Sequence, residues 1–310
     1  MKQFTIIGHV DTGKSTLGGR ILVETKTVEW DQKKSLASFL DIYEEEQIKS
    51  KTHEWSAYEF EYNNQLFRMI DTPGHKIYIR SMIEAISKNP TDTALVVLSA
   101  RSNEFDSSFK NGQTKEDLLL ARATGHENLI IAINKIDTIE DDDTINQKIM
   151  YIQEKIQSYT KQLKFKNIVL CPVSAITGQG IDYLLNSIEK YSVEKNGDKN
   201  HNDESIKRSD SCEMIQTNTV KMEFAYVRND LLISGTVSIA HINGKEYNVE
   251  LMCKERFIKK PGKYTITIRF LDTVVNVHHE QKIILRHEQN TLGFGKICGI
   301  KPLKPCNAKK

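Results

Sequence analysis

The stretch Gly8-His9-Val10-Asp11-Thr12-Gly13-Lys14-Ser15-Thr16 decides the fold of this chain. It fits the phosphate-loop pattern G-x-x-x-x-G-K-[ST]. The apolar residues 4–7 before it indicate a buried strand, and residues 17–24 after it, which lack proline, indicate a helix. In such a unit, backbone N–H groups at the helix N-terminus bind phosphates, and glycines let the backbone come close. Alone, the pattern also fits a glycine-containing turn before an ordinary helix.

Two side chains of this stretch have their own expected roles. The Lys14 ammonium would reach the β- and γ-phosphates of a nucleotide, and the Ser15 hydroxyl would bind Mg²⁺. We take the whole run as candidate nucleotide-binding residues, namely Gly8, His9, Val10, Asp11, Thr12, Gly13, Lys14, Ser15 and Thr16.

A second motif, Asp71-Thr72-Pro73-Gly74-His75, follows the strand-like residues 66–70. An aspartate at a strand end near the phosphates can hold Mg²⁺ through a water. The N–H of Gly74 can meet a γ-phosphate, because no side chain blocks the approach. The alternative is a Pro-Gly turn capped by an aspartate. We count Asp71, Thr72, Pro73 and Gly74 as candidate nucleotide-binding residues.

A third motif, Asn134-Lys135-Ile136-Asp137, follows the apolar residues 129–133. The carboxylate of Asp137 can accept both the N1–H and the 2-amino hydrogens of guanine. Adenine offers neither donor, and leaving a buried acceptor unpaired costs about 1–3 kcal/mol. By itself this tetrapeptide is more often a surface turn.

A fourth motif, Ser174-Ala175 with Ile176 beside it, follows the apolar residues 168–171. A backbone N–H here can bind the guanine oxygen. In open α/β sheets, ligands bind at the carboxyl ends of the strands, and all four motifs occupy that place. The sequence therefore predicts a guanine-nucleotide site, with GTP and GDP as substrate and product.

With these motifs the chain resembles the translational GTPases, and within them elongation factor 1-alpha and its close relatives. The run 8–16 is similar to that family's phosphate loop nearly letter for letter, and 71–75 resembles its second switch. Residues 104–116 resemble a stretch of the elongation factor 1-alpha branch. The similarity runs from Met1 to about Tyr191. It implies a P-loop GTPase domain, an α/β fold with a mainly parallel six-stranded sheet and helices on both faces.

The resemblance also implies catalytic and metal-binding roles. His75 would orient the attacking water, and Thr52 aligns with the Mg²⁺-binding threonine of the first switch. Together with Ser15 and Asp71, Thr52 would complete the expected Mg²⁺ site. The implied activity is Mg²⁺-dependent hydrolysis of GTP, slow without a ribosome-like activator.

The chain departs from the family just before Thr52. The family usually has Glu-Arg-Glu-Arg/Lys-Gly-Ile-Thr there, whereas this chain has Ser50 for the glycine and Lys51 for the isoleucine. In the family, that isoleucine pairs with the residue at Val10 as an apolar gate before the histidine. A lysine changes this gate, while the nucleotide-binding motifs are intact.

Composition and charge restrict the classes of partner that we expect this protein to bind. The net charge is +2, so nucleic-acid binding would need a local basic patch, and we expect no DNA partner. The five cysteines show no C-x-x-C pair, which favours reduced thiols in a cytoplasmic chain and disfavours zinc. No apolar run approaches the roughly 18 residues of a membrane span, so we expect no membrane partner. Abundant Lys, Ile and Asn are typical of an AT-rich coding sequence, as in some viruses; a viral source would place the protein in host cytoplasm.

The sequence pattern divides the chain into four parts. Residues 1–191 alternate strands and helices and form the nucleotide domain. Residues 192–218 are a polar linker with almost nothing to bury. Residues 219–303 form a small antiparallel β-barrel that resembles the C-terminal domain of elongation factor 1-alpha. Residues 304–310 are a basic tail.

The prediction of a barrel is based on local sequence patterns. Residues 264–270 alternate, with Ile266 and Ile268 facing in, and Asn243-Gly244 is a strong hairpin-turn signal. The resembled family has two barrels after the nucleotide domain, and this chain has room for one. The missing middle barrel is the one that helps to hold aminoacyl-tRNA.

Three functions remain open. The first is a GTP-hydrolysing factor that contacts ribosomes, tRNA or an exchange factor. The second is a GTP-dependent binding module or decoy of the translation machinery with little hydrolysis. The third is a regulatory GTPase with no link to translation. His75 favours the first, whereas Ser50, Lys51 and the missing barrel favour the second.

Overall fold

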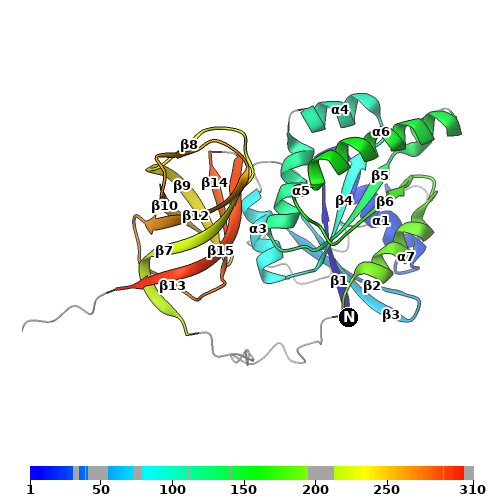
Figure 1. Ribbon diagram of the computed structural model, residues 1–310. Helices are drawn as coiled ribbons and strands as arrows, with labels where there is room; N and C mark the ends of the chain where they lie inside the picture. Colours follow the sequence, from blue (N-terminus) through cyan, green and yellow to red (C-terminus); the bar gives the residue numbers. More distant parts are fainter. Residues whose placement is uncertain are drawn as a thin grey trace, which may run out of the picture. The chain divides into compact units, whose positions relative to one another are not determined.

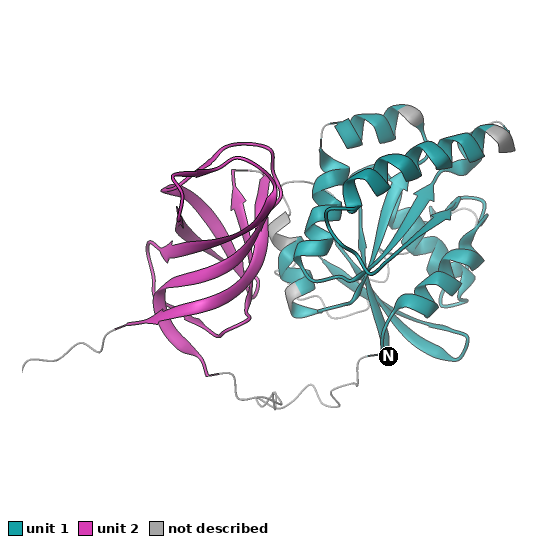
Figure 2. Ribbon diagram, in the orientation of Figure 1, with its two compact units in different colours: residues 1–197 teal, residues 198–310 magenta. Residues whose placement is uncertain are grey.

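The computed structural model describes most of the chain. The described residues are 1–30, 35–38, 40, 55–72, 79–110, 112–139, 141–194, 213–288 and 290–303. Some expected features lie outside them, namely Ser50, Lys51, Thr52, Pro73, Gly74, His75, residues 195–212 of the predicted linker and the tail 304–310. The chain forms two compact units, residues 1–197 and 198–310 (Figure 2).

The first unit is built on one six-stranded sheet of order β2-β3-β1-β4-β5-β6 (Figure 1). Its strands are β1 (Lys2–Ile7), β2 (Ser56–Tyr62), β3 (Gln65–Asp71), β4 (Thr93–Ser99), β5 (Asn128–Asn134) and β6 (Asn167–Pro172). Every pairing is parallel except that of β2 with β3. These two strands form a hairpin whose turn residues, Asn63 and Asn64, have φ of 51° and 58°. The mainly parallel six-stranded sheet is confirmed.

Helices cover both faces of this sheet, as predicted. The helices are α1 (Lys14–Glu24), α3 (Ile79–Lys88), α4 (Ser102–Lys110), α5 (Gln113–Ala123), α6 (Asp142–Thr160) and α7 (Ile181–Tyr191), with a short 3₁₀ turn, η2 (Ile136–Thr138). The helices α1 and α7 share one core with the sheet, and α3, α5 and α6 lie on the opposite side (Figure 1). Because both faces are covered, β4 and β5 are buried along their whole length.

The second unit is a closed antiparallel barrel, which confirms the predicted fold class. Its main strands are β7 (Ile215–Tyr226), β9 (Thr236–Ile242), β10 (Lys245–Cys253), β12 (Gly262–Phe270), β14 (Lys282–His287) and β15 (Asn290–Pro302). Pairing of β12 with β7 closes the ring. Shorter strands flank it: β8 (Leu232–Ile233), β11 (Phe257–Ile258) and β13 (Val275–Val277).

Local signals explain the barrel's register. Asn243 and Gly244 have φ of 50° and 76° and form the tight turn between β9 and β10, as the sequence predicts. Ile266 and Ile268 are 1% and 0% exposed, so the alternation in β12 has the predicted phase. The strand β7 begins at Ile215, inside the residues assigned to the linker, because its alternation already buries Thr217 there.

None of the helices in the described part of the chain has both the length and the apolar character needed to cross a membrane.

Candidate functional site

The four sequence motifs meet at one edge of the six-stranded sheet. Each follows the carboxyl end of a strand: β1, β3, β5 or β6 (Figure 1). The strands β1 and β3 are parallel with Ile6 opposite Asp71, and β5 and β6 are parallel neighbours as well. Parallel strands end at the same edge, so their loops converge.

The phosphate loop ends at an uncapped helix N-terminus. Gly13 is the N-cap of α1 with φ of 89°, and it carries no capping side chain. The first intrahelical bond runs from Leu17 N–H to Gly13 O, at 2.8 Å, so the N–H groups of residues 14–16 precede the hydrogen-bond ladder. Inside the loop, the Thr12 hydroxyl donates to His9 O at 2.8 Å. Such a terminus favours anions such as phosphates.

Two close approaches explain the glycines of the loop. A Cβ at Gly8 would lie 2.6 Å from Val97 O, and one at Gly13 would lie 2.4 Å from Asn134 Nδ2. Either contact is shorter than real side chains tolerate, so both positions require glycine. The loop is therefore packed directly against β4 and against the motif after β5.

Asn134 joins three of the four motifs. Its side chain is 2% exposed; Nδ2 donates to Thr12 O at 3.0 Å, and Oδ1 accepts from Ala175 N–H at 3.0 Å. Ser174 and Ala175 are buried beside it, whereas the Ile176 side chain is 63% exposed. One buried amide thus fixes the phosphate loop relative to the loop at 174–176.

Lys135 and Asp137 lie on the more exposed side of the site. Lys135 has a left-handed backbone with φ of 70° and precedes η2, in which Asp137 is exposed. The Lys135 ammonium donates to Glu104 Oε2 at 2.7 Å. Burial raises the pKa of the Glu104 carboxyl, but hydrogen bonds from Lys135, Ser99 and Arg101 outweigh it and hold the pKa below its usual value.

The β3 motif is described only at its start. Thr72 is 2% exposed, and its hydroxyl donates to Ile6 O at 2.7 Å, which ties the motif to β1 just before the phosphate loop. Asp71, at the end of β3, is half-buried. Pro73, Gly74 and His75 lie outside the described residues, as does Thr52.

The residues present fit a magnesium ion. The Ser15 hydroxyl is exposed at the start of α1, and the Asp71 carboxylate ends the strand paired to β1. Mg²⁺ prefers oxygen ligands and is typically held by one or two side chains together with phosphates and waters. The described residues contain no group of three or more His, Cys, Asp or Glu suited to a metal.

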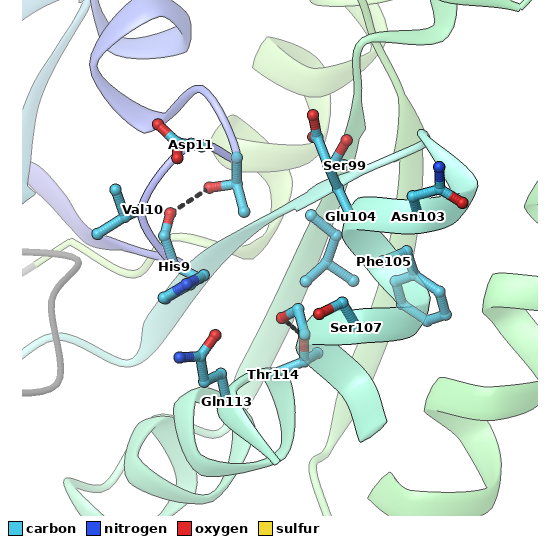
Figure 3. Close-up of a pocket in the computed structure, with 13 residues that line it drawn as sticks. His9, Val10, Asp11, Ser99, Asn103, Glu104, Phe105, Ser107, Gln113 and Thr114 are labelled. Atoms are coloured by element: carbon cyan, nitrogen blue, oxygen red, sulfur yellow. Dashed lines mark hydrogen bonds between the residues drawn. The ribbon is translucent and has the colours of Figure 1, made fainter. Parts of the chain in front are cut away.

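A pocket of about 290 Å³ lies beside the phosphate loop (Figure 3). Residues 9–12 of that loop form one wall, and the end of β4, α4 and the start of α5 form the others. Figure 3 shows His9 and Gln113 on one side of it and Asn103 and Phe105 on the other. The residues that line the pocket include neither the guanine-reading motifs nor Lys14 and Ser15, so the pocket adjoins the candidate nucleotide site without forming it.

Two residues that contact the site carry no sequence motif for that role. Glu104 contacts Lys135, and Arg20 contacts the loop at 174–176, so each joins segments that are far apart in the chain. A buried charged side chain is generally paired, so a partner for each could be expected. The sequence does not indicate which residue that partner is.

The site belongs to a known class of nucleotide-binding domain. Residues 1–194 match the family described as the elongation factor Tu GTP binding domain. The chain therefore belongs to the elongation factor Tu GTP-binding domain family, and the predicted resemblance to translational GTPases is confirmed.

Curated relatives support this placement. Elongation factor 1-alpha of Hyperthermus butylicus is 37% identical over 196 residues, which cover 58% of this chain and 44% of that protein. The eukaryotic peptide chain release factor GTP-binding subunit of Schizosaccharomyces pombe is 36% identical over 200 residues, which cover 58% and 30%. The chain thus spans less than half the length of these relatives.

Solved structures share the fold. The S. cerevisiae Ski7 GTPase-like domain bound to GTP superposes with a TM-score of 0.73 at 12% identity, covering 96% of this chain and 97% of that one. Elongation factor SelB from Methanococcus maripaludis with a GTP analogue gives 0.66 at 17% identity, covering 97% and 80%. At these identities the likeness concerns the fold alone.

Proposed function

We propose that this protein binds GTP and GDP and hydrolyses GTP to GDP and phosphate, as a divergent translational GTPase. The observation that carries the proposal is the buried Asn134 amide, which links the phosphate loop to the loop at 174–176 with Asp137 three residues on. Phosphate binding and base reading then occur at one place. Membership of the family supports the same conclusion.

The chain's own residues supply binding and positioning. The N–H groups at the start of α1 and the Lys14 ammonium hold the phosphates, and the Asp137 carboxylate accepts the guanine hydrogens. Ser15 and Asp71, with Thr52 by family resemblance, would hold Mg²⁺, which would neutralise charge on the β- and γ-phosphates.

By the same resemblance, His75 orients the attacking water. We extend the proposal to the domain roles expected from sequence: a nucleotide domain over residues 1–191, a linker after it, and a C-terminal barrel whose first strand begins at Ile215 rather than at the predicted position 219. A cytoplasmic location follows from a role in translation.

A second candidate, a GTP-dependent binding module with little hydrolysis, is favoured by one observation. Lys51 stands where the resembled family has an apolar gate residue opposite Val10. Val10 itself is 39% exposed. A charged lysine at position 51 cannot close an apolar gate with Val10. We expect this change to weaken the control of His75 in hydrolysis and to leave nucleotide binding intact.

The test is GTP turnover with and without purified ribosomes, for wild type, His75→Ala and a control, His279→Ala, which changes an exposed histidine of the barrel. We expect ribosomes to stimulate wild type and His279→Ala. His75→Ala should bind GTP nearly as well as wild type but turn over more slowly, because its role lies in the transition state. Tight GTP binding with turnover that ribosomes leave unchanged would favour the binding module.

Partners are proposed separately from hydrolysis. The described residues contain one barrel after the nucleotide domain, whereas the resembled family encloses an aminoacylated tRNA end between two walls. We therefore expect weak binding of tRNA, through exposed barrel cations such as Arg256, Lys259 and Lys260, that falls steeply with salt and ignores the amino acid. Arg286, which the sequence also suggests for this role, is only 8% exposed and so is poorly placed to contact phosphates. Filter binding of charged and uncharged tRNA, with a non-hydrolysable GTP analogue, tests this; a clear preference for charged tRNA would overturn it.

A further inference from the structure

Arg20 lies almost fully buried between α1 and the loop at 174–176. Its side chain projects from the helix that follows the phosphate loop, and the residue is 4% exposed. Its Nε donates to Ala175 O at 2.7 Å, and its Nη2 donates to Ile176 O. The planar guanidinium thus spans two successive carbonyls of a loop that is 155 residues away in sequence.

The rest of the guanidinium is also held. Nη1 lies 3.3 Å from Glu24 Oε1, one helical turn further along α1. The Trp30 ring stacks on the group, with the Arg20 Cζ 4.5 Å from the ring centroid. A buried charge needs such partners, and a stacked, multiply bonded arginine keeps one geometry. Arg20 therefore acts as a fixed brace for the loop.

One backbone N–H group of the loop at 174–176 has no acceptor among the described residues. The N–H groups of Ser174, Ala175, Thr177 and Gly178 donate to Gln179 O, Asn134 Oδ1, Ser174 Oγ and Ser174 O. No acceptor among the described residues takes the N–H of Ile176, whose carbonyl is the one that Arg20 holds. The carbonyls point to Arg20, which fixes the orientation of the adjoining peptide planes.

We propose that Arg20 is a specificity-determining positioning residue, which orients the loop at 174–176 so that its backbone reads the 6-oxo group of guanine. This rests on the proposed guanine-nucleotide function. In this role Arg20 acts through the two carbonyls that it binds, those of Ala175 and Ile176. The base is then read by two independent devices: the Asp137 carboxylate for the N1 and 2-amino hydrogens, and the loop held by Arg20 for the oxygen.

Nucleotide analogues separate these devices. Hypoxanthine lacks only the 2-amino group, and 6-thioguanine keeps both hydrogens but replaces the oxygen with a weak, larger acceptor. Binding of GDP, IDP and 6-thio-GDP at neutral pH would be measured by calorimetry for wild type, Arg20→Met and Arg20→Lys. Methionine keeps much of the apolar stem, and lysine keeps one charge but cannot span two carbonyls.

The matched control is Arg122→Met. Arg122, at the end of α5, also donates through Nε to a backbone carbonyl, that of Leu163 at 2.9 Å, and neither residue belongs to the four nucleotide-binding motifs. It has the same chemistry and a comparable contact. Its substitution should leave all three affinities as in wild type.

We expect wild type to prefer GDP over both analogues. In Arg20→Met the preference for GDP over 6-thio-GDP should fall by about two- to tenfold, the worth of one hydrogen bond, while the preference over IDP stays. The preference of Arg20→Lys for GDP over 6-thio-GDP should lie between those of wild type and Arg20→Met. If Arg20→Met does not fold, Arg20→Lys alone must show the fall.

Equal losses for all three nucleotides, or an unchanged 6-thio-GDP ratio, would overturn the role of Arg20. Failure of wild type to bind any of the three would instead overturn the proposed function.

Discussion

The Lys135 ammonium lies 2.7 Å from Glu104 Oε2, so the guanine-reading motif after β5 is bonded to α4. Arg101 Nη1 contacts the other oxygen of the same carboxylate at 3.2 Å. The Glu104 side chain is 35% exposed, and that of Lys135 is 18% exposed. The lysine side chain is therefore held in place by a helix that also lines the pocket beside the phosphate loop.

Replacing Glu104 by Gln should destabilise the protein modestly and in a pH-dependent way. The pKa of Glu104 is lowered in the folded protein, so its ion pair contributes stability above its unfolded pKa. That contribution disappears as the pH falls through the lowered folded pKa. We expect a difference of no more than about 1 kcal/mol at neutral pH, since the pair is partly solvated.

Urea unfolding of wild type and Glu104→Gln across the acidic range measures this difference. Glu154→Gln, at an exposed position of α6, is the control. A gap between wild type and Glu104→Gln that widened on acidification would contradict the assignment of charge to this pair.

Gly13→Ala should abolish tight nucleotide binding, whereas Gly112→Ala should not. Both glycines are helix N-caps, with φ of 89° and 82°. A Cβ at Gly13 meets Asn134 Nδ2 at 2.4 Å, whereas one at Gly112 meets nothing within 4 Å. Each variant bears a backbone cost of about 1–2 kcal/mol. Only the first displaces the Asn134 amide.

Thermal unfolding and GDP titration distinguish the two costs. We expect Gly13→Ala to unfold at a lower temperature than Gly112→Ala, because two hydrogen bonds of buried Asn134 are disturbed in the first variant alone. We also expect a loss of GDP affinity of at least about tenfold in Gly13→Ala alone. Comparable GDP affinity in the two variants would show that Asn134 does not tie the loops together functionally.

Cys171 should resist alkylation in the native protein. It is buried near the carboxyl end of β6, and burial raises the pKa of its thiol to about 11, despite a hydrogen bond to Ser187. At pH 8 only about one molecule in a thousand carries the reactive thiolate, and access is blocked as well. Iodoacetamide treatment with peptide mass mapping should label the exposed Cys298 before Cys171. Equal labelling of Cys171 without denaturant would show that β6 opens readily.

The parts of the fold with strong local signals could be predicted from the sequence. The run before Asn134 indicates its own structure, because a parallel strand covered on both faces is continuously apolar, and β5 is buried throughout. The phosphate loop and the shorter apolar runs before Asp71 and Ser174 mark β1, β3 and β6 by their position before a motif. Asn243-Gly244 predicts a hairpin because both residues readily adopt positive φ.

Other elements depend on contacts that no local pattern carries. The helix α4 is polar and was not predicted; it forms because Phe105, 2% exposed, packs into the core and Glu104 reaches Lys135. The strand β2 was also not predicted, although the turn at Asn63-Asn64 is a recognisable signal. The bond of Arg20 to the loop at 174–176 depends on the packing of α1, which the sequence pattern does not give.

Asp137 is the residue on which the claim of guanine specificity rests. It is exposed in the middle of η2, in the same motif as Asn134 and Lys135, whose side chains are held by hydrogen bonds. Asp137→Asn replaces an acceptor with an amide that can also donate, so it should weaken GDP binding and favour xanthosine diphosphate, which offers an oxygen at the 2-position. This reversal would assign the specificity to one side chain.

Equilibrium binding of GDP, ADP and XDP to wild type and Asp137→Asn in the presence of Mg²⁺ tests guanine specificity most directly. We expect wild type to bind GDP far more tightly than ADP or XDP, and Asp137→Asn to prefer XDP over GDP. Equal binding of GDP and ADP by wild type would contradict that specificity.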